Sequence, residues 1–264
     1  MAAVPPDDLA RARTALGERA PLVQCLTNSV VQTITANALL AVGAAPAMVD
    51  NVHEAAAFAA LASAVLVNVG TLDEEKARAM ALAAQSAQGA GTPWVLDPVA
   101  VGGLEFRTRV ARDLLAHRPA VVRGNASEVL GLAGAGAGGR GVDAVDGVED
   151  AVAAARDLAA RTGGAVAVSG AVDVVVDATR TVRVPGGDAL LTRTTGAGCS
   201  LGALTAAYAA VVDGDPLTAA VAAHLHVAVA AEGGGGGGPR AGAFASARFV
   251  LIEELVVQLP RAPG

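Results

Sequence analysis

Short apolar runs alternate with longer segments of mixed polarity along most of the chain. Residues 64–69, an apolar run broken only by Asn68, are typical of a strand covered on both faces, as in a parallel sheet. Strands that alternate with helices indicate βαβ units. We therefore expect an α/β fold with a mostly parallel sheet. The expected strands are residues 21–25, 47–49, 64–69, 94–96, 120–122 and 165–168, and a hairpin of residues 172–176 and 181–184.

Capping residues and glycines set the expected ends of the helices. Asn51, with Glu54 three residues later, matches the capping-box pattern at a helix start. The acidic residues 73–75 also favour a helix start, because the helix dipole is positive there. The expected helices are residues 30–42, those beginning near 51 and 73, residues 105–116, 128–132 and 148–161, and three segments after Gly198 with breaks at 213–215 and at the glycine run 233–238. Residues 134–141 are expected to be a glycine-rich loop.

Composition supports a folded protein. Of the 264 residues, 53% are hydrophobic and only 17% charged, which excludes a disordered chain. Aromatic residues make up 2%, so Ala, Val and Leu must form the core. No repeat of fixed period is visible, and we interpret the glycine run as a loop between helices. We expect a single domain over residues 1–264.

Charge and cysteine content indicate which partners and which cellular compartment to expect. The formal net charge is −6 and Lys and Arg are not clustered, which argues against a nucleic-acid partner. Cys25 and Cys199 form neither a CxxC pair nor a disulfide framework, as expected in a reducing cytoplasm. The N-terminus has no signal-peptide pattern. The uncharged stretches 25–49 and 194–212 contain internal polar residues, so we expect buried strand and helix rather than membrane spans.

Polar residues follow several of the expected strands. Ligands of open α/β sheets bind beyond the carboxyl ends of the strands, so these positions are candidates for a site. Each one alone has an alternative interpretation as a cap or turn residue. The candidates are Asn28, Asn68, Asp97, Arg123, Asn125, Glu128 and Ser169.

Residues 193–200 (Arg-Thr-Thr-Gly-Ala-Gly-Cys-Ser) enter an apolar helix and are the most informative segment. Gly196 and Gly198 allow a sharp turn, and backbone N–H groups around Ala197 at a helix N-terminus favour an anion such as a transferring phosphoryl group. Cys199 lies in the first turn, where its thiolate is favoured and could accept a proton from an alcohol. The alternative is a strand-to-helix turn with Cys199 as a small buried hydrophobe.

Asp97 and Glu128 suggest a metal site. Phosphoryl transfer from a nucleotide requires Mg²⁺, which prefers carboxylate and water oxygens, and Arg123 could clamp phosphate oxygens. A turn at Asp97, a first-turn charge at Glu128 and a surface ion pair at Arg123 are the structural alternatives. The chain has no P-loop, protein-kinase or dinucleotide signature, and its four histidines are scattered rather than clustered as zinc ligands.

Seven segments, in order, resemble the hydroxyethylthiazole kinases. They are residues 24–28, 35–37, 43–48, 67–72, 96–99, 123–128 and 195–199. The resemblance implies a ribokinase-like three-layer α/β fold with helices on both faces of the sheet. It also implies ATP- and Mg²⁺-dependent phosphorylation of the hydroxyl of 4-methyl-5-(2-hydroxyethyl)thiazole in thiamine salvage.

The resemblance also implies roles for residues on the nucleotide side. Arg123, Ser169 and Asn125 are expected to bind ATP, and Asp97 and Glu128 to lie near the metal. Ser169 stands where the family usually has Thr, so a hydroxyl is retained.

On the acceptor side, the resemblance implies that Met48, Gly196 and Asn28 bind the thiazole. Cys199, with the neighbouring amides of Gly198 and Ala197, is expected to be catalytic. It occupies the place where related sugar and vitamin kinases carry an Asp. The resemblance also implies a homotrimer with the thiazole site at a subunit boundary.

Two other functions are open at this point. The chain could be a kinase of the same fold that acts on a pyrimidine alcohol or pyridoxal, although such kinases more often carry Asp at the position of Cys199. It could instead be a catalytically silent sensor of thiazole or nucleotide. Measuring ADP release with a panel of alcohol substrates distinguishes these functions.

Overall fold

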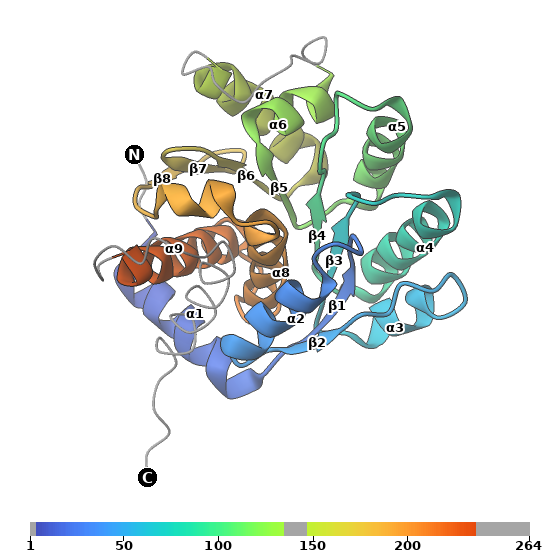
Figure 1. Ribbon diagram of the computed structural model, residues 1–264, viewed down its shortest axis with the longest axis horizontal. Helices are drawn as coiled ribbons and strands as arrows, with labels where there is room; N and C mark the ends of the chain where they lie inside the picture. The colour runs from blue at the N-terminus through green and yellow to red at the C-terminus, as the bar shows by residue number, and fades with distance from the viewer. Residues whose placement is uncertain (1–3, 135–146, 236–264) are drawn as a thin grey trace.

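A central sheet with helices on both faces organises the computed structural model, which describes residues 4–134 and 147–235 (Figure 1). Within these residues the sheet has eight strands in the order β2-β1-β3-β4-β5-β6-β7-β8. The first six in this order are parallel, and β7 and β8 add antiparallel to one edge. The strands are β1 (Leu22–Leu26), β2 (Ala45–Ala47), β3 (Ala64–Asn68), β4 (Trp94–Asp97), β5 (Val121–Asn125), β6 (Ala165–Ser169), β7 (Asp173–Val176) and β8 (Thr181–Val184).

Each strand of the sheet alternates its side chains between two apolar layers. In β1, Val23 and Cys25 contribute to one core cluster, and Leu26 contributes to the other. Helices α1, α2, α8 and α9 cover the first face, and α3 to α7 cover the second (Figure 1). The expected three-layer α/β fold is confirmed. The helices are α1 (Pro6–Arg19), α2 (Gln32–Ala41), α3 (Ala55–Leu61), α4 (Glu74–Ala90), α5 (Glu105–Leu114), α6 (Ala126–Ala133), α7 (Gly147–Thr162), α8 (Ala197–Ala209) and α9 (Pro216–Gly235), with 3-10 turns at Leu115–His117 and Ala189–Arg193.

Two expected local features are wrong. Asn51 does not cap α3, because its side chain accepts a hydrogen bond from His53 N–H at 2.9 Å and closes a local turn. Helix α3 begins after Glu54 without a side-chain cap. Strand β2 lies two residues earlier than expected, since parallel pairing places Ala45 opposite Leu22. Helix α1 was not anticipated at all; Pro6 stands at its first position.

The glycine-rich segments are only partly described. Helix α9 continues to Gly235, so the break expected from residue 233 begins no earlier than 236. Residues 236–238 and the third helical segment lie outside the described residues, as does most of the expected loop 134–141. Within the described residues, no helix is both long and apolar enough to span a membrane.

The chain order creates a switch point beside β1. Strand β2 lies on one side of β1 and β3 on the other, and α2 and α3 cover opposite faces. Open α/β sheets bind ligands at the carboxyl ends of the strands at such a point. Helix α8 packs across β1, β3 and β4 on the first face, and its N-terminus lies at this carboxyl edge.

Candidate active site

The N-terminus of α8 is formed by a glycine in the left-handed region. Gly196 has φ +93°, and a side chain there would come within 2.7 Å of Ile34 Cγ2, so only glycine fits. Its carbonyl accepts the first helical hydrogen bond from Ser200 N–H at 2.8 Å. Helix geometry leaves the amides of Gly198 and Cys199 without partners inside the helix. These two N–H groups are therefore free to donate hydrogen bonds to a ligand.

Arg123, the third residue of β5, lies against this first turn. A Cβ added to Gly198 would be 2.8 Å from Arg123 Nη1. Arg123 Nη2 donates a hydrogen bond to Ser169 Oγ at 2.7 Å, and Nη1 lies 3.9 Å from Asp97 Oδ1. Only 12% of the Arg123 side chain is exposed. Its planar guanidinium and the amides of α8 thus converge on one small space suited to phosphate oxygens.

A chain of amide hydrogen bonds joins the switch point to Asp97. Asn28 Nδ2 donates to Asn68 Oδ1 at 3.2 Å and lies 3.4 Å from Cys199 Sγ. Asn68 Nδ2 in turn donates to Asp97 Oδ2 at 2.7 Å. Asn68 was a candidate only by its place after β3. The structure shows that it links Asn28, Asp97 and, through Asn28, Cys199.

Asp97 is fully buried at the end of β4. Burial and, less strongly, the nearby Glu128 carboxylate raise its pKa to about 7, against the opposing effects of Arg123 and Asn68. A Cβ at Gly202 of α8 would lie 3.2 Å from Asp97 Oδ2, so α8 packs closely over the carboxylate. The site thus holds an acid that titrates near neutral pH, as functional carboxylates often do.

The surroundings of Cys199 favour the thiol over the thiolate. Burial and the charge of Asp97 raise its pKa to about 11, although Asn68, Asn28 and Arg123 oppose the shift. The expectation that the helix N-terminus favours the thiolate is therefore wrong. The desolvated position beside a carboxylate outweighs the helix dipole.

Asn125 and Glu128 form the capping box of α6. Asn125 Oδ1 accepts from Glu128 N–H at 2.9 Å, and Glu128 Oε2 accepts from Asn125 N–H at 2.9 Å. Glu128 Oε1 also accepts from Ala100 N–H at 2.9 Å. Both carboxylate oxygens thus already fix the backbone at the ends of β4 and β5. Each oxygen retains a second lone pair for a further ligand.

Met48 follows edge strand β2, beside β1. Its side chain is half-buried against the first core cluster. Gln24 Nε2 holds the next residue by donating to Val49 O at 2.8 Å. Gln24 was missed as a candidate because it lies within an otherwise apolar strand. It fixes the chain that carries Met48 at the carboxyl edge.

The carboxylates meet the modest requirements of Mg²⁺. Within the described residues, no group of three or more His, Cys, Asp or Glu side chains is arranged as a metal site. Mg²⁺ usually keeps several waters and takes one or two carboxylates besides substrate phosphates. Asp97 Oδ1 is buried and accepts no hydrogen bond. Asp97 and Glu128 therefore fit a Mg²⁺ that arrives with a nucleotide.

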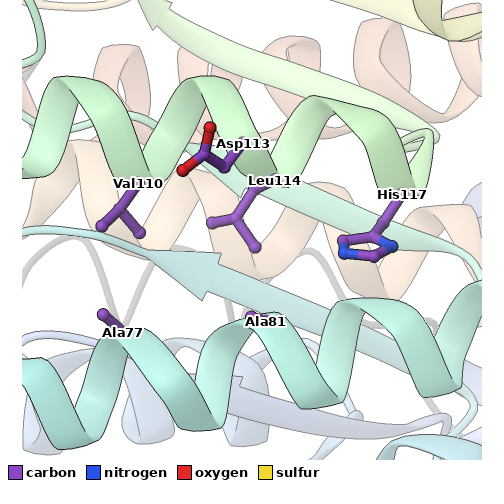
Figure 2. Close-up of a pocket in the computed structure, with 6 residues that line it drawn as sticks. All are labelled: Ala77, Ala81, Val110, Asp113, Leu114 and His117. Carbon is purple, nitrogen blue, oxygen red and sulfur yellow. The ribbon is translucent and has the colours of Figure 1, made fainter.

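A shallow pocket lies elsewhere, between α4 and α5 (Figure 2). Ala77 and Ala81 of α4 face Val110, Leu114 and neighbouring residues across it (Figure 2). Its lining contains none of the polar residues that gather at the carboxyl edge.

Comparison with known proteins agrees with this geometry. The chain matches the model of the hydroxyethylthiazole kinase family over residues 14–259. A hydroxyethylthiazole kinase from Kineococcus radiotolerans is 77% identical over 244 residues, covering 92% of this chain and 88% of the relative. This chain belongs to the hydroxyethylthiazole kinase family.

Solved structures place this hydroxyethylthiazole kinase family member in a wider fold group. A hydroxyethylthiazole kinase from Pyrococcus horikoshii has a TM-score of 0.85 and 38% identity, covering 95% of this chain and 93% of that one. A ribokinase-like superfamily protein from Enterococcus faecalis has a TM-score of 0.64 at 12% identity, covering 98% and 92%. At that identity the likeness concerns the fold alone, and the expected ribokinase-like fold is confirmed.

Proposed function

We propose that this protein transfers the γ-phosphoryl group of ATP to the hydroxyl of 4-methyl-5-(2-hydroxyethyl)thiazole, in thiamine salvage. One observation carries the proposal most strongly. Arg123 lies across the free amides of α8 while Asp97 is buried beside it. Phosphoryl transfer needs positioning and charge neutralisation more than covalent chemistry, and this arrangement offers both.

Arg123, Ser169 and Asn125 bind ATP in this proposal. The Arg123 guanidinium donates hydrogen bonds to the phosphate oxygens. The bond from Arg123 Nη2 to Ser169 Oγ, 2.7 Å long, fixes the orientation of the guanidinium plane. The first-turn amides of Gly198 and Cys199 hold the phosphoryl group as its charge develops. The Ala197 N–H, also expected to take part, already donates to Thr194 O at 3.2 Å and instead fixes the turn before α8. Asn125 acts through the capping box, which fixes the end of β5 beneath the nucleotide.

Asp97 and Glu128 would hold Mg²⁺. When bound, the ion neutralises charge on the phosphates of ATP. The unpartnered Asp97 Oδ1 faces the Arg123 side, and Glu128 contributes from the start of α6. Asn68 fixes the other oxygen of Asp97, so the carboxylate cannot rotate away.

Cys199 orients the acceptor alcohol. Its sulfur lies 3.4 Å from Asn28 Nδ2, so the thiol is held at the mouth of the anion hole. A loose transition state develops little charge on the attacking hydroxyl, and a strong base is not required. A protonated thiol is a weak base, so turnover below the ~10 s⁻¹ typical of enzymes is expected.

Asn28, Gly196 and Met48 bind the thiazole ring in this proposal, and the active form is a cytoplasmic homotrimer with this site at the subunit boundary. Support comes from exposed apolar side chains in the segment that follows Asn28. Val30 follows Asn28 and is 64% exposed, and Leu40 of α2 is 58% exposed. Light scattering after gel filtration tests the trimer. The domain is proposed to be single, since one sheet joins all the described strands.

An ADP-release assay with a panel of alcohols tests the activity. Hydroxyethylthiazole, hydroxymethylpyrimidine and pyridoxal are compared at equal concentration with Mg²⁺ and ATP. The proposal expects hydroxyethylthiazole to give the highest kcat/KM. Preference for either other alcohol would identify a different kinase, and nucleotide binding without alcohol-dependent ADP release would indicate a sensor.

A further inference from the structure

A buried histidine and an aspartate form a close pair behind the nucleotide side of the site. His224 Nδ1 of α9 lies 2.6 Å from Asp173 Oδ2 at the start of β7. The His224 side chain is fully buried, and that of Asp173 is 22% exposed. None of the roles assigned above uses either residue.

Asp173 also closes the turn that follows Ser169. Its Oδ1 accepts a hydrogen bond from Gly170 N–H at 2.9 Å. Burial alone would raise the pKa of Asp173, but His224, Gly170 and Arg123 together hold it below its ordinary value. Asp173 is therefore a carboxylate near Arg123, and it fixes the residue next to the serine that binds Arg123.

We propose that His224 and Asp173 are positioning residues for ATP. The inference rests on the proposed function. His224 holds Asp173, Asp173 holds Gly170, and the adjacent Ser169 hydroxyl then meets Arg123 Nη2 in the orientation that places the guanidinium over Gly198. The pair contacts no substrate itself. It keeps the phosphate-binding face of Arg123 in place before ATP arrives, which reduces the ordering cost of binding.

Two observations argue against a purely structural role. His224 Nε2 is buried without a hydrogen-bond partner, and such an atom costs stability that an apolar side chain of similar size would not cost. The β7–β8 hairpin also has a second anchor to α9 at its other end. There Arg180 bonds Asp177 and both carboxylate oxygens of Asp215. The hairpin does not need His224 merely to stay attached.

The two anchors supply a matched comparison. His224→Leu removes the donor to Asp173, and Asp173→Ala removes both of its bonds. His224→Asn keeps an N–H donor near the Nδ1 position. Asp215→Asn is the control, because it weakens the distant anchor between the same elements while its amide can still cap α9.

The measurements are the Kd of ATP by displacement of a fluorescent nucleotide, the KM of each substrate, kcat and Tm. His224→Leu and Asp173→Ala are expected to raise the Kd and KM for ATP about tenfold. The KM for hydroxyethylthiazole should change less than about twofold. His224→Asn should recover most of the ATP affinity. Asp215→Asn should lower Tm with unchanged ATP affinity.

An unchanged Kd for ATP in folded His224→Leu and Asp173→Ala would overturn the inference. So would an equal loss of ATP affinity in Asp215→Asn, or failure of His224→Asn to restore binding. If His224→Leu does not fold, Asp173→Ala decides, since its site is partly exposed. The ATP-binding measurement requires no thiazole, so it can be interpreted even if hydroxyethylthiazole is not the substrate. That outcome would be seen separately in the ADP-release assay.

Discussion

Arg123 and Gly198 fit together without room for another carbon atom. A Cβ at position 198 would lie 2.8 Å from Arg123 Nη1, closer than real side-chain contacts allow. Arg123 of β5 and Gly198 at the start of α8 are 75 positions apart (198 − 123) and come together because both lie toward the carboxyl edge of the sheet. This contact places the Arg123 guanidinium directly beside the free backbone amides of α8.

Gly198→Ala is the smallest change that tests this contact. The added methyl must displace Arg123 from the first turn of α8. Since small displacements of positioning groups cost about a hundredfold in rate, kcat/KM for ATP should fall by about that factor. Steady-state kinetics with varied ATP measure the effect.

Gly89→Ala is the matched control for that variant. Gly89 lies in α4, and nothing is within 4 Å of its added Cβ. It should keep full activity and slightly raise Tm, because Ala favours a helix interior. Normal ATP kinetics in Gly198→Ala would mean that Arg123 does not act where we place it.

Asp97→Asn should stabilise the protein while removing activity. Folding raises the pKa of Asp97 from 3.8 to about 7. A carboxyl with a raised folded pKa costs nothing below about pH 4, and its cost grows as the pH rises to 7. Asn removes that cost, so Tm should rise by about 5 °C at pH 8, with a gain that shrinks toward pH 4.

The same variant tests the metal role, because Asn is a poor Mg²⁺ ligand. Thermal unfolding across pH and ADP release are both measured. A lower Tm at pH 8 would contradict the burial argument. Wild-type activity would exclude Asp97 from the metal site.

Glu128 has a structural role that can be separated from its proposed metal role. Glu128→Gln retains the capping box, because the Gln oxygen can also accept from Asn125 N–H, but it loses the acceptor for Ala100 N–H. Its Tm should fall less than that of Glu128→Ala, while the Mg²⁺ needed for half-maximal activity rises about tenfold. Glu128→Ala should lose both, with Tm lower by about 3 °C. Equal Mg²⁺ requirements in Glu128→Gln and wild type would leave Glu128 as a cap alone.

Cys199 should be mostly protonated at neutral pH, so its rate of alkylation should rise with pH as the thiolate forms. With a pKa raised to about 11, its thiolate fraction grows tenfold per pH unit between pH 7 and 9. Alkylation by iodoacetamide, followed by mass spectrometry of the Cys199 peptide, should show that slope. Cys25 is the internal control, since it is 1% exposed and should remain unlabelled in the folded protein. A Cys199 rate that is already constant near pH 7 would show a stabilised thiolate instead.

Much of the site follows from the sequence because parallel strands end at one edge. Asn28, Asp97 and Ser169 each come directly after, or end, a buried apolar run, and the sheet brings them together. The order of the strands need not be known to predict that these side chains lie at the same edge. What the sequence does not show is which polar groups bond to which, since Asn68 meets Asp97 through a register set only by pairing of β3 with β4.

Capping illustrates the limit of local patterns. Asn51 with Glu54 and Asn125 with Glu128 have the same spacing, yet only the second pair forms a capping box. Asn51 bonds His53 N–H instead, because the short Asx turn competes with the helix cap. The pairing of His224 is hidden from the sequence for a related reason. Its partner Asp173 is 51 positions away, and no helical or strand periodicity relates the two.

The most direct test measures thiazole phosphate and ADP together in wild type and in Gly198→Val. The wild type should give ADP and hydroxyethylthiazole phosphate in equal amounts, only when Mg²⁺, ATP and the alcohol are all present. Folded Gly198→Val should give neither product, because its larger side chain blocks the space before Arg123. Equal product formation by both proteins, or ADP release by the wild type that does not depend on the alcohol, would show that the proposed function is wrong.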